Sequence, residues 1–209
     1  MKVTLYGATG QIGRRILEEL LQRGHSVTAV VRDPAKLAPR RGLAVMPGDV
    51  DDVAGITAAS KGADALVSAY GPGAEDPEKL LPVTRNLIEG TEQSGVLRFL
   101  FVGGAGSLEV APGVTLIDSG HLPEEWKGIA IAHRDALEMA RASAINWTCL
   151  SPAGFIQPGQ RTGKFRLGTD RLLTDDRGES RISMEDFAIA FVDELESPRH
   201  ERRRFTIAY

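Results

Sequence analysis

The chain has 209 residues, 42% hydrophobic and 25% charged, a balance typical of one soluble globular domain spanning 1–209. Its formal net charge of −3, without a long basic run, argues against nucleic-acid binding. No apolar run approaches the ~20 residues of a membrane span, and a single cysteine excludes an internal disulfide. The first apolar run begins at Val3, which leaves no room for a signal peptide, so we expect a cytoplasmic protein.

The first apolar run ends in three glycines at three-residue spacing, and an amphipathic helical pattern follows. Gly7 allows a tight turn, Gly10 lets the backbone approach a diphosphate, and Gly13 lets the helix pack close to the strand. The helix N-terminus then offers free N–H groups and a positive dipole end. The alternative is a glycine-rich turn without a ligand. The pattern favours a dinucleotide site comprising Gly7, Thr9, Gly10, Gln11, Ile12 and Gly13.

Short apolar runs alternate with helical patterns along the rest of the chain. We expect strands at Val3–Tyr6, Ser26–Val31, Ala44–Pro47, Ala65–Ala69, Phe99–Val102, Trp147–Leu150 and Phe205–Ala208. We expect helices at Gln11–Arg23, Val53–Lys61, Lys79–Ser94, Glu124–Ser143 and Ser183–Leu195. Gly24 and Gly95 are placed to end two of these helices. The alternation predicts an α/β fold with a doubly wound parallel sheet, the NAD(P)-binding Rossmann fold.

Two long segments, 107–123 and 152–179, exceed what a Rossmann unit needs. Each begins where an expected strand ends, and doubly wound sheets bind ligands at that edge. We expect the two segments to wall a substrate site, and 165–174 to form a small hairpin. Surface loops with no role are the alternative.

The end of the second expected strand bears on which nicotinamide cofactor binds. Arg32 is the first side chain past this strand, and Lys36 follows one helical turn later. A guanidinium suits bidentate binding of a 2′-phosphate, and Arg14 could add charge. These residues favour NADP as the cofactor. The alternative is that the Asp33 carboxylate binds the ribose hydroxyls, in which case NAD remains possible.

A cluster of acidic residues follows the third expected strand. The Asp49 carboxylate can accept a hydrogen bond from the adenine amino group, with Val50 against the ring. We expect Asp51 and Asp52 to cap the next helix.

Several motifs together resemble those of the atypical short-chain dehydrogenase/reductases. They are the three glycines, Arg32-Asp33-Pro34, Gly48-Asp49-Val50, Val102-Gly103-Gly104-Ala105-Gly106-Ser107-Leu108 and Ser151-Pro152-Ala153-Gly154-Phe155. The similarity spans essentially the whole chain and is greatest to the NAD(P)H-binding, NmrA-like group that includes biliverdin reductase B-type flavin reductases.

The resemblance implies roles for three further segments. The end of the fourth strand, with Ala69, Tyr70 and Gly71, would contact the ribose and phosphates of the cofactor. Pro152, Ala153, Gly154 and Phe155 would cradle the nicotinamide amide, and Ser107 would face the nicotinamide.

The chain departs from the main short-chain dehydrogenases in lacking a Tyr-x-x-x-Lys pair. On the helix expected after the fifth strand, one face carries Trp126, Ala130, His133, Leu137 and Ala140. His133 could protonate a substrate or hydrogen-bond the cofactor, or could be a histidine satisfied by backbone. Ser107 could donate a hydrogen bond to the substrate or nicotinamide, or could be a loop hydroxyl. Trp126 could line the pocket or anchor its helix, and we expect it to be an anchor.

These features favour an enzyme, an NADPH-dependent reductase that transfers hydride to a flavin- or quinone-like acceptor. Hydride transfer between planar rings needs little acid–base machinery. The alternative is a non-catalytic NAD(P)-binding redox sensor of the NmrA type, whereas a sugar-nucleotide epimerase normally needs the missing pair. No cluster has metal-ligand spacing, and we expect neither a nucleic-acid nor a membrane partner. A monomer and a homodimer are both compatible with the sequence.

Overall fold

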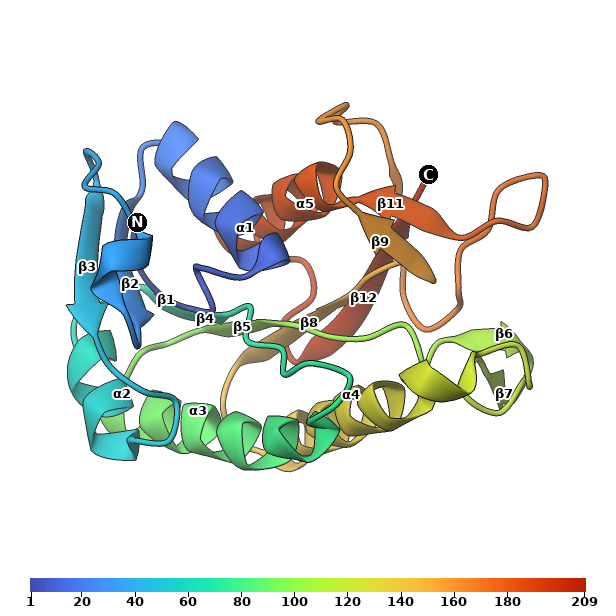
Figure 1. Cartoon of the computed structure of the whole chain (residues 1–209), viewed down its shortest axis with the longest axis horizontal. Coiled ribbons are helices and arrows are strands. Elements are labelled where there is room, and N and C mark those ends of the chain that lie inside the picture. Colours follow the sequence, from blue (N-terminus) through green and yellow to red (C-terminus); the bar gives the residue numbers. More distant parts are fainter.

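The computed structural model describes residues 1–209, and its centre is a sheet of eight strands (Figure 1). The strand order is β3-β2-β1-β4-β5-β8-β12-β10. Neighbours are parallel except that β10 runs antiparallel to β12. These strands are β1 Lys2–Tyr6, β2 Ser26–Val31, β3 Leu43–Pro47, β4 Ala65–Ser68, β5 Phe99–Val102, β8 Trp147–Ser151, β10 Arg166–Gly168 and β12 Arg203–Ala208. The order reverses between β1 and β4, the switch point where such sheets bind ligands.

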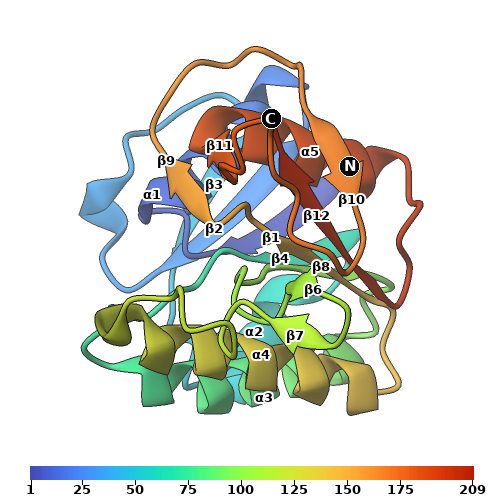
Figure 2. The same cartoon turned by 90° about the vertical axis from the view of Figure 1, so that its right-hand side faces the viewer.

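Helices cover both faces of the sheet (Figures 1 and 2). One face carries α1 (Gln11–Gln22) and α5 (Met184–Glu196), which pack against each other. The other carries α2 (Val53–Ser60), α3 (Leu80–Ser94) and α4 (Glu124–Ala142), packed side by side in that order. The sheet is therefore buried between two helical layers, which explains why its strands are short continuous apolar runs.

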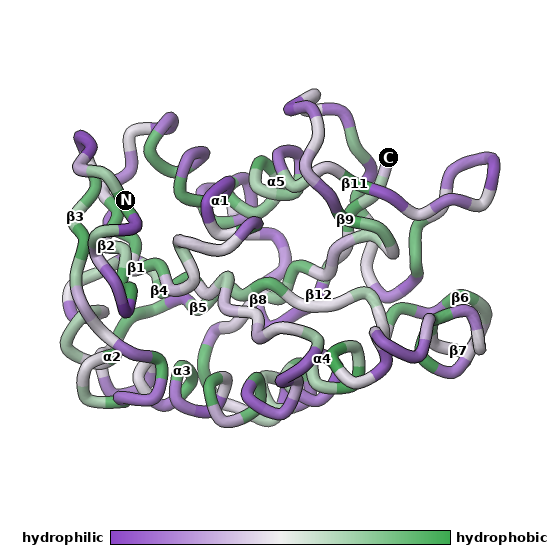
Figure 3. Tube along the Cα trace, viewed as in Figure 1, coloured by the Kyte–Doolittle hydropathy of each residue, from purple (hydrophilic) through white to green (hydrophobic).

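Each face of the sheet has its own hydrophobic core, and hydrophobic residues follow the central strands (Figure 3). Leu5 joins the cluster under α1 and α5, whereas the next residue, Tyr6, joins the cluster under α2 and α3. This alternation is the two-residue period of a strand. None of the helices combines the length and hydropathy needed to cross a bilayer.

The predicted doubly wound fold is confirmed. Each expected strand and helix is present, and no boundary differs by more than two residues. Gly24 and Gly95 follow α1 and α3 with φ of +77° and +72°, the left-handed conformation that ends a helix. Local apolar patterns were sufficient for most of these elements because they bury residues against a neighbouring layer, whereas β3, at the sheet edge, has no fully buried residue.

The expected hairpin at 165–174 is wrong. Its first strand, β10, pairs instead with β12, so that Arg166 lies opposite Ala208 and Gly168 opposite Thr206. The sequence patterns also missed four short strands, which are β6 Glu109–Ala111, β7 Val114–Thr115, β9 Phe155–Gln157 and β11 Arg181–Ser183. Strands of two or three residues are too short to show a period, and β9 and β11 pair with each other from distant parts of the chain.

The two long segments meet at one edge of the molecule, where the chain after β10 lies beside β6 (Figure 2). The Glu109 N–H donates to the Asp170 carbonyl at 2.8 Å, and the Leu172 N–H donates to the Glu109 carbonyl at 2.9 Å. Residues 158–164 are held elsewhere, on α1 and α5: Arg161 pairs with Glu19 at 2.8 Å. The second segment is thus divided between two attachments.

Contact between α2 and α3 depends on a glycine. A Cβ at Gly90 would lie 2.3 Å from Cγ2 of Ile56, which is fully buried. We expect Gly90→Ala to lower the free energy of unfolding by about 1–3 kcal/mol, because the overpacking outweighs the gain in helix propensity. Urea denaturation measures the change, and Glu92→Ala, an exposed change on the same helix, is the matched control. Equal stability of the two variants would contradict the packing argument.

Candidate functional site

The three glycines stand where the end of β1 meets the start of α1. Gly7 has φ of +81°, and a Cβ there would lie 2.5 Å from the Ala69 carbonyl carbon. A Cβ at Gly13 would lie 2.0 Å from the Gly7 carbonyl oxygen. A Cβ at Gly10 would meet only that oxygen, at 3.3 Å. Gly7 and Gly13 are thus required by the fold itself, while the exposed backbone at Gly10 is left open to a ligand.

The N-terminus of α1 has the properties of an anion site. Gly10 occupies the N-cap, no side chain caps the helix, and its first turn carries no acidic residue. The first-turn N–H groups, at Gln11, Ile12 and Gly13, have no intrahelical acceptors. Together with the helix dipole they would bind phosphate oxygens, with Thr9 partly exposed beside them. The turn therefore fits the diphosphate of a dinucleotide.

At the end of β2, Arg32 has no ionic partner, whereas the neighbouring Asp33 is hydrogen-bonded. Arg32 and Lys36 are exposed and form no ion pair. The Asp33 carboxylate accepts a hydrogen bond from the Ala35 N–H at 3.1 Å and caps the short 3₁₀ turn η1, Pro34–Lys36. A capping role for Asp33 weakens the alternative in which its carboxylate holds the ribose.

Beyond β3, the carboxylates divide their roles differently from the expectation. Asp52 caps α2 by accepting from the Gly55 N–H at 3.0 Å, as expected, but Asp51 caps nothing. Asp49 accepts from the Asp51 N–H at 3.2 Å, so one of its oxygens orders this turn. Asn86 on α3 donates to the Val50 carbonyl at 3.1 Å and fixes the turn from below. Only the tertiary packing of α3 identifies Asn86.

Tyr70, just beyond β4, lies where these turns converge. Burial and the nearby Asp51 carboxylate raise the pKa of its hydroxyl, while Lys79 and Arg32 oppose the shift. Its N–H donates to the Ser68 hydroxyl at 3.3 Å. Nothing lies within 4 Å of a Cβ placed at Gly71. The charged residues that follow β2 and β3 thus lie near Tyr70, which follows β4.

The segment after β8 is a second ordered turn. Pro152 and Ala153 are buried, and the Gly154 N–H donates to the Ser180 hydroxyl at 3.0 Å. The Phe155 N–H donates to the Ser180 carbonyl at 2.8 Å, whereas the Phe155 side chain is 73% exposed. The Ser151 hydroxyl, at the end of β8, is buried without a hydrogen-bond partner. Ser180 holds this turn and was missed by sequence reasoning because the two segments are distant in the chain.

Ser107 follows β5 and has a partner that no sequence pattern indicated. Its Oγ accepts a hydrogen bond from Nη1 of Arg204 at 2.9 Å. Arg204 comes from β12 and also donates from Nε to the Asp170 carboxylate at 3.0 Å. The hydroxyl is therefore attached to the C-terminal strand rather than being a free loop group.

His133 lies on α4 against the turn after β5. A Cβ at Gly104 would lie 2.8 Å from the His133 Cβ, so the glycine admits the imidazole side chain. The ring lines a small cavity with Tyr70 and Phe101, and no protein group hydrogen-bonds its nitrogens. The structure therefore provides no backbone partner, which was the expected alternative. Burial lowers the pKa of His133 to about 4, so the ring is neutral at pH 7.

Trp126 does not anchor α4. Its side chain is 52% exposed, whereas Ala130, Leu137 and Ala140 on the same stripe are buried. The stripe begins only after the first turn of the helix, which extends past the sheet, so the predicted anchor is wrong.

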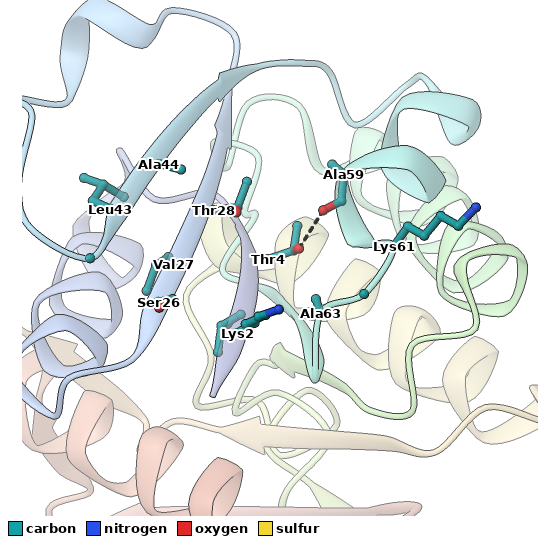
Figure 4. A pocket seen from close by; sticks show the side chains of 13 residues that line it. Lys2, Thr4, Ser26, Val27, Thr28, Leu43, Ala44, Ala59, Lys61 and Ala63 are labelled. Atoms are coloured by element: carbon teal, nitrogen blue, oxygen red, sulfur yellow. Dashed lines mark hydrogen bonds between the residues drawn. The ribbon is translucent and has the colours of Figure 1, made fainter.

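One pocket lies away from these turns. It has a volume of about 520 Å³ and is lined by the amino ends of β1, β2 and β3 and by the residues after α2 (Figure 4). Thr4 donates to the Ala59 carbonyl at 2.9 Å within it, and the lysines Lys2 and Lys61 do not converge (Figure 4). Ligands of doubly wound sheets bind at the opposite, carboxyl edge, so we do not place the active site here.

The lowered pKa of His133 has a measurable consequence for stability. The unfolded chain takes up a proton near pH 6.5, whereas the folded protein resists protonation until about pH 4. The free energy of unfolding should therefore fall as the pH drops through this window. In His133→Asn this contribution is absent, so the stability difference between the proteins should change between pH 6.5 and 4. A constant difference, or an NMR titration of His133 near pH 6.5, would contradict the burial argument.

Comparison with known proteins identifies the family. The NAD(P)H-binding family model matches residues 7–198. A Burkholderia pseudomallei structure, provisionally assigned as an exported protein, is 46% identical, covers 100% of both chains and has a TM-score of 0.92. A Bacteroides thetaiotaomicron structure, provisionally assigned as an epimerase, is 43% identical, with a TM-score of 0.94 and coverage of 100% of this chain and 96% of its own. A Streptococcus pneumoniae structure, provisionally assigned as an NADH-flavin reductase, is 36% identical, with a TM-score of 0.86 and coverage of 100% and 99%. The chain belongs to the NAD(P)H-binding family.

Proposed function

We propose that this protein is an NADPH-dependent oxidoreductase that transfers hydride to a small planar acceptor of the flavin or quinone type. The observation that carries the proposal is a dinucleotide cradle without a charged acid–base pair beside it. No tyrosine is followed by a lysine four residues later, and burial keeps His133 neutral at pH 7. Hydride transfer between planar rings depends on alignment and exclusion of water rather than on a side-chain acid.

The chain's own residues would align the two rings. The turn Pro152–Phe155, held by Ser180, would orient the carboxamide of the cofactor. The exposed ring of Phe155 offers an aromatic face for a planar acceptor. The bound cofactor would supply the hydride from its nicotinamide C4, and water would supply the proton that completes reduction. Segments 107–123 and 152–179 would wall the acceptor side.

The preference for NADPH rests on the charges around the end of β2. Arg32 and Lys36 are exposed and unpaired, and Arg14 is exposed on the first turn of α1. A guanidinium can bind a 2′-phosphate through two parallel hydrogen bonds. The Asp33 carboxylate, which would favour NADH, is engaged with the Ala35 N–H.

Two of the three similar structures carry an assigned activity, and the two activities differ. The Streptococcus pneumoniae protein supports a flavin-type acceptor. The Bacteroides thetaiotaomicron protein is provisionally assigned as an epimerase, an activity for which this chain lacks the usual tyrosine–lysine pair. The missing pair therefore favours the reductase.

A panel of acceptors tests the activity. Purified protein mixed with NADPH should oxidise it in the presence of FMN, FAD, a quinone or a redox dye, as followed at 340 nm. The rate should be proportional to protein concentration and exceed the rate without protein. Tight cofactor binding without turnover for any acceptor would contradict the proposal and favour a non-catalytic redox sensor.

Substitution of Arg32 tests the cofactor preference. Arg32→Ala should raise the Kd for NADPH about 10-fold or more and leave the Kd for NADH nearly unchanged, because a charge-assisted phosphate contact contributes roughly 1.5–3 kcal/mol. Isothermal titration calorimetry measures both constants. Arg41→Ala, an exposed arginine at the amino edge of the sheet, is the matched control. An unchanged preference in Arg32→Ala would make the assignment wrong.

A further inference from the structure

A buried arginine lies next to the proposed acceptor site. Arg204 on β12 is 6% exposed and stands opposite Cys149 of β8. Its Nη1 donates to Ser107 Oγ at 2.9 Å, and its Nε donates to the Asp170 carboxylate at 3.0 Å. Asp170 also receives Nη2 of the same guanidinium. One charged side chain thus joins the C-terminal strand to both long segments.

The chemistry of the pair assigns a direction to the Ser107 hydroxyl. A guanidinium is always protonated and can only donate hydrogen bonds. Ser107 Oγ must therefore be the acceptor in its contact with Arg204. The hydroxyl has one hydrogen of its own, and in the structure it donates no hydrogen bond to a protein group. That hydrogen is left for a group from outside the protein.

Burial of the Arg204 guanidinium costs free energy, and its two partners offset this cost in different ways. A buried cation needs both a counter-charge and satisfied donors. Asp170 supplies the charge, but its side chain is 55% exposed and also lies 3.7 Å from Arg141. Ser107 satisfies the remaining guanidinium nitrogen from the interior side. The contact with Ser107 therefore helps to hold the arginine in place, and the arginine in turn holds the Ser107 hydroxyl.

The backbone around both partners is fixed. The Leu108 N–H donates to the Ala105 carbonyl, and the Ile117 N–H donates to the Gly106 carbonyl, each at 2.9 Å. The Asp170 carbonyl accepts from the Glu109 N–H at 2.8 Å. The strands that precede Ser107 and the Pro152–Phe155 turn, β5 and β8, are neighbours in the sheet. The hydroxyl consequently has a defined position relative to Arg204 and the end of segment 107–123 that follows β5.

We propose that Arg204 is a positioning residue that fixes the Ser107 hydroxyl as a hydrogen-bond donor to the bound ligand. The ligand group would be a carbonyl oxygen, either of the nicotinamide carboxamide or of the acceptor. The proposal rests on the proposed function in placing Ser107 at the ligand. It predicts that Arg204 acts on the ligand through Ser107 and has no independent effect on it.

A double-mutant cycle tests this coupling. Ser107→Ala and Arg204→Gln should each lower kcat/KM for FMN or raise the Kd for NADPH by about 3- to 10-fold, the range for one hydrogen bond. The double variant should be no worse than either single variant, because both remove the same interaction. Multiplying effects would show that Arg204 acts independently of Ser107 and would overturn the proposal.

Two further variants separate positioning from folding. Arg203→Gln changes the neighbouring exposed arginine and should leave both constants unchanged. Asp170→Asn removes the exposed counter-charge while Ser107 and Arg204 remain, and should give a smaller loss than Arg204→Gln. Thermal unfolding of each variant identifies any that fail to fold. If Arg204→Gln does not fold, Asp170→Asn takes its place in the cycle, both alone and combined with Ser107→Ala.

The two readouts distinguish failure of this proposal from failure of the proposed function. If the wild type turns over FMN but Ser107→Ala changes neither constant, the role of the pair is wrong and the reductase stands. If the wild type binds NADPH without turnover on any acceptor, the proposed reductase activity is wrong. The double-mutant cycle measured in the Kd for NADPH then tests the coupling of Arg204 to Ser107. If the changes in the Kd for NADPH were additive, or if there were no change, the proposed role of Arg204 and Ser107 would be overturned.

Discussion

The close approach of α1 to the end of β1 is the constraint on which the site depends. A single carbonyl, that of Gly7, lies 2.0 Å from where a Cβ of Gly13 would be, so any side chain there would push the helix away. Gly7 in turn backs onto Ala69 at the end of β4. The turn therefore fixes the uncapped N-terminus of α1 directly over the switch point, where its N–H groups can meet a diphosphate.

The rest of the site is arranged around that turn by contacts between distant segments. Asn86 of α3 holds the turn after β3, and Ser180 holds the turn after β8. Arg204 and the pairing of Glu109 with the chain at Asp170 join the two long segments at the sheet edge. Each contact satisfies backbone or hydroxyl groups of a loop, and so makes the loop a defined surface rather than a flexible one.

The chemistry that this surface favours follows from the lack of a charged acid–base group in it. His133 is close to the turn after β5 but is kept neutral by burial. The Ser107 hydroxyl accepts a hydrogen bond from Arg204, whose guanidinium is paired with the Asp170 carboxylate. The site can therefore orient and hydrogen-bond a ligand, which suits direct hydride transfer better than alcohol oxidation.

Apolar patterns and glycine spacing were enough to predict the elements of the sheet and the position of the glycine turn. Both are encoded locally, in apolar runs that bury a whole strand and in glycines at fixed spacing along a few residues. The folded protein was needed to show that Asp52 rather than Asp51 caps α2, that β10 pairs with β12, and that Trp126 is exposed. Ser107 and Arg204 are 97 residues apart, and no local pattern links them. The hydroxyl was recognisable from sequence, but its direction depends on a guanidinium that only the folded sheet brings beside it.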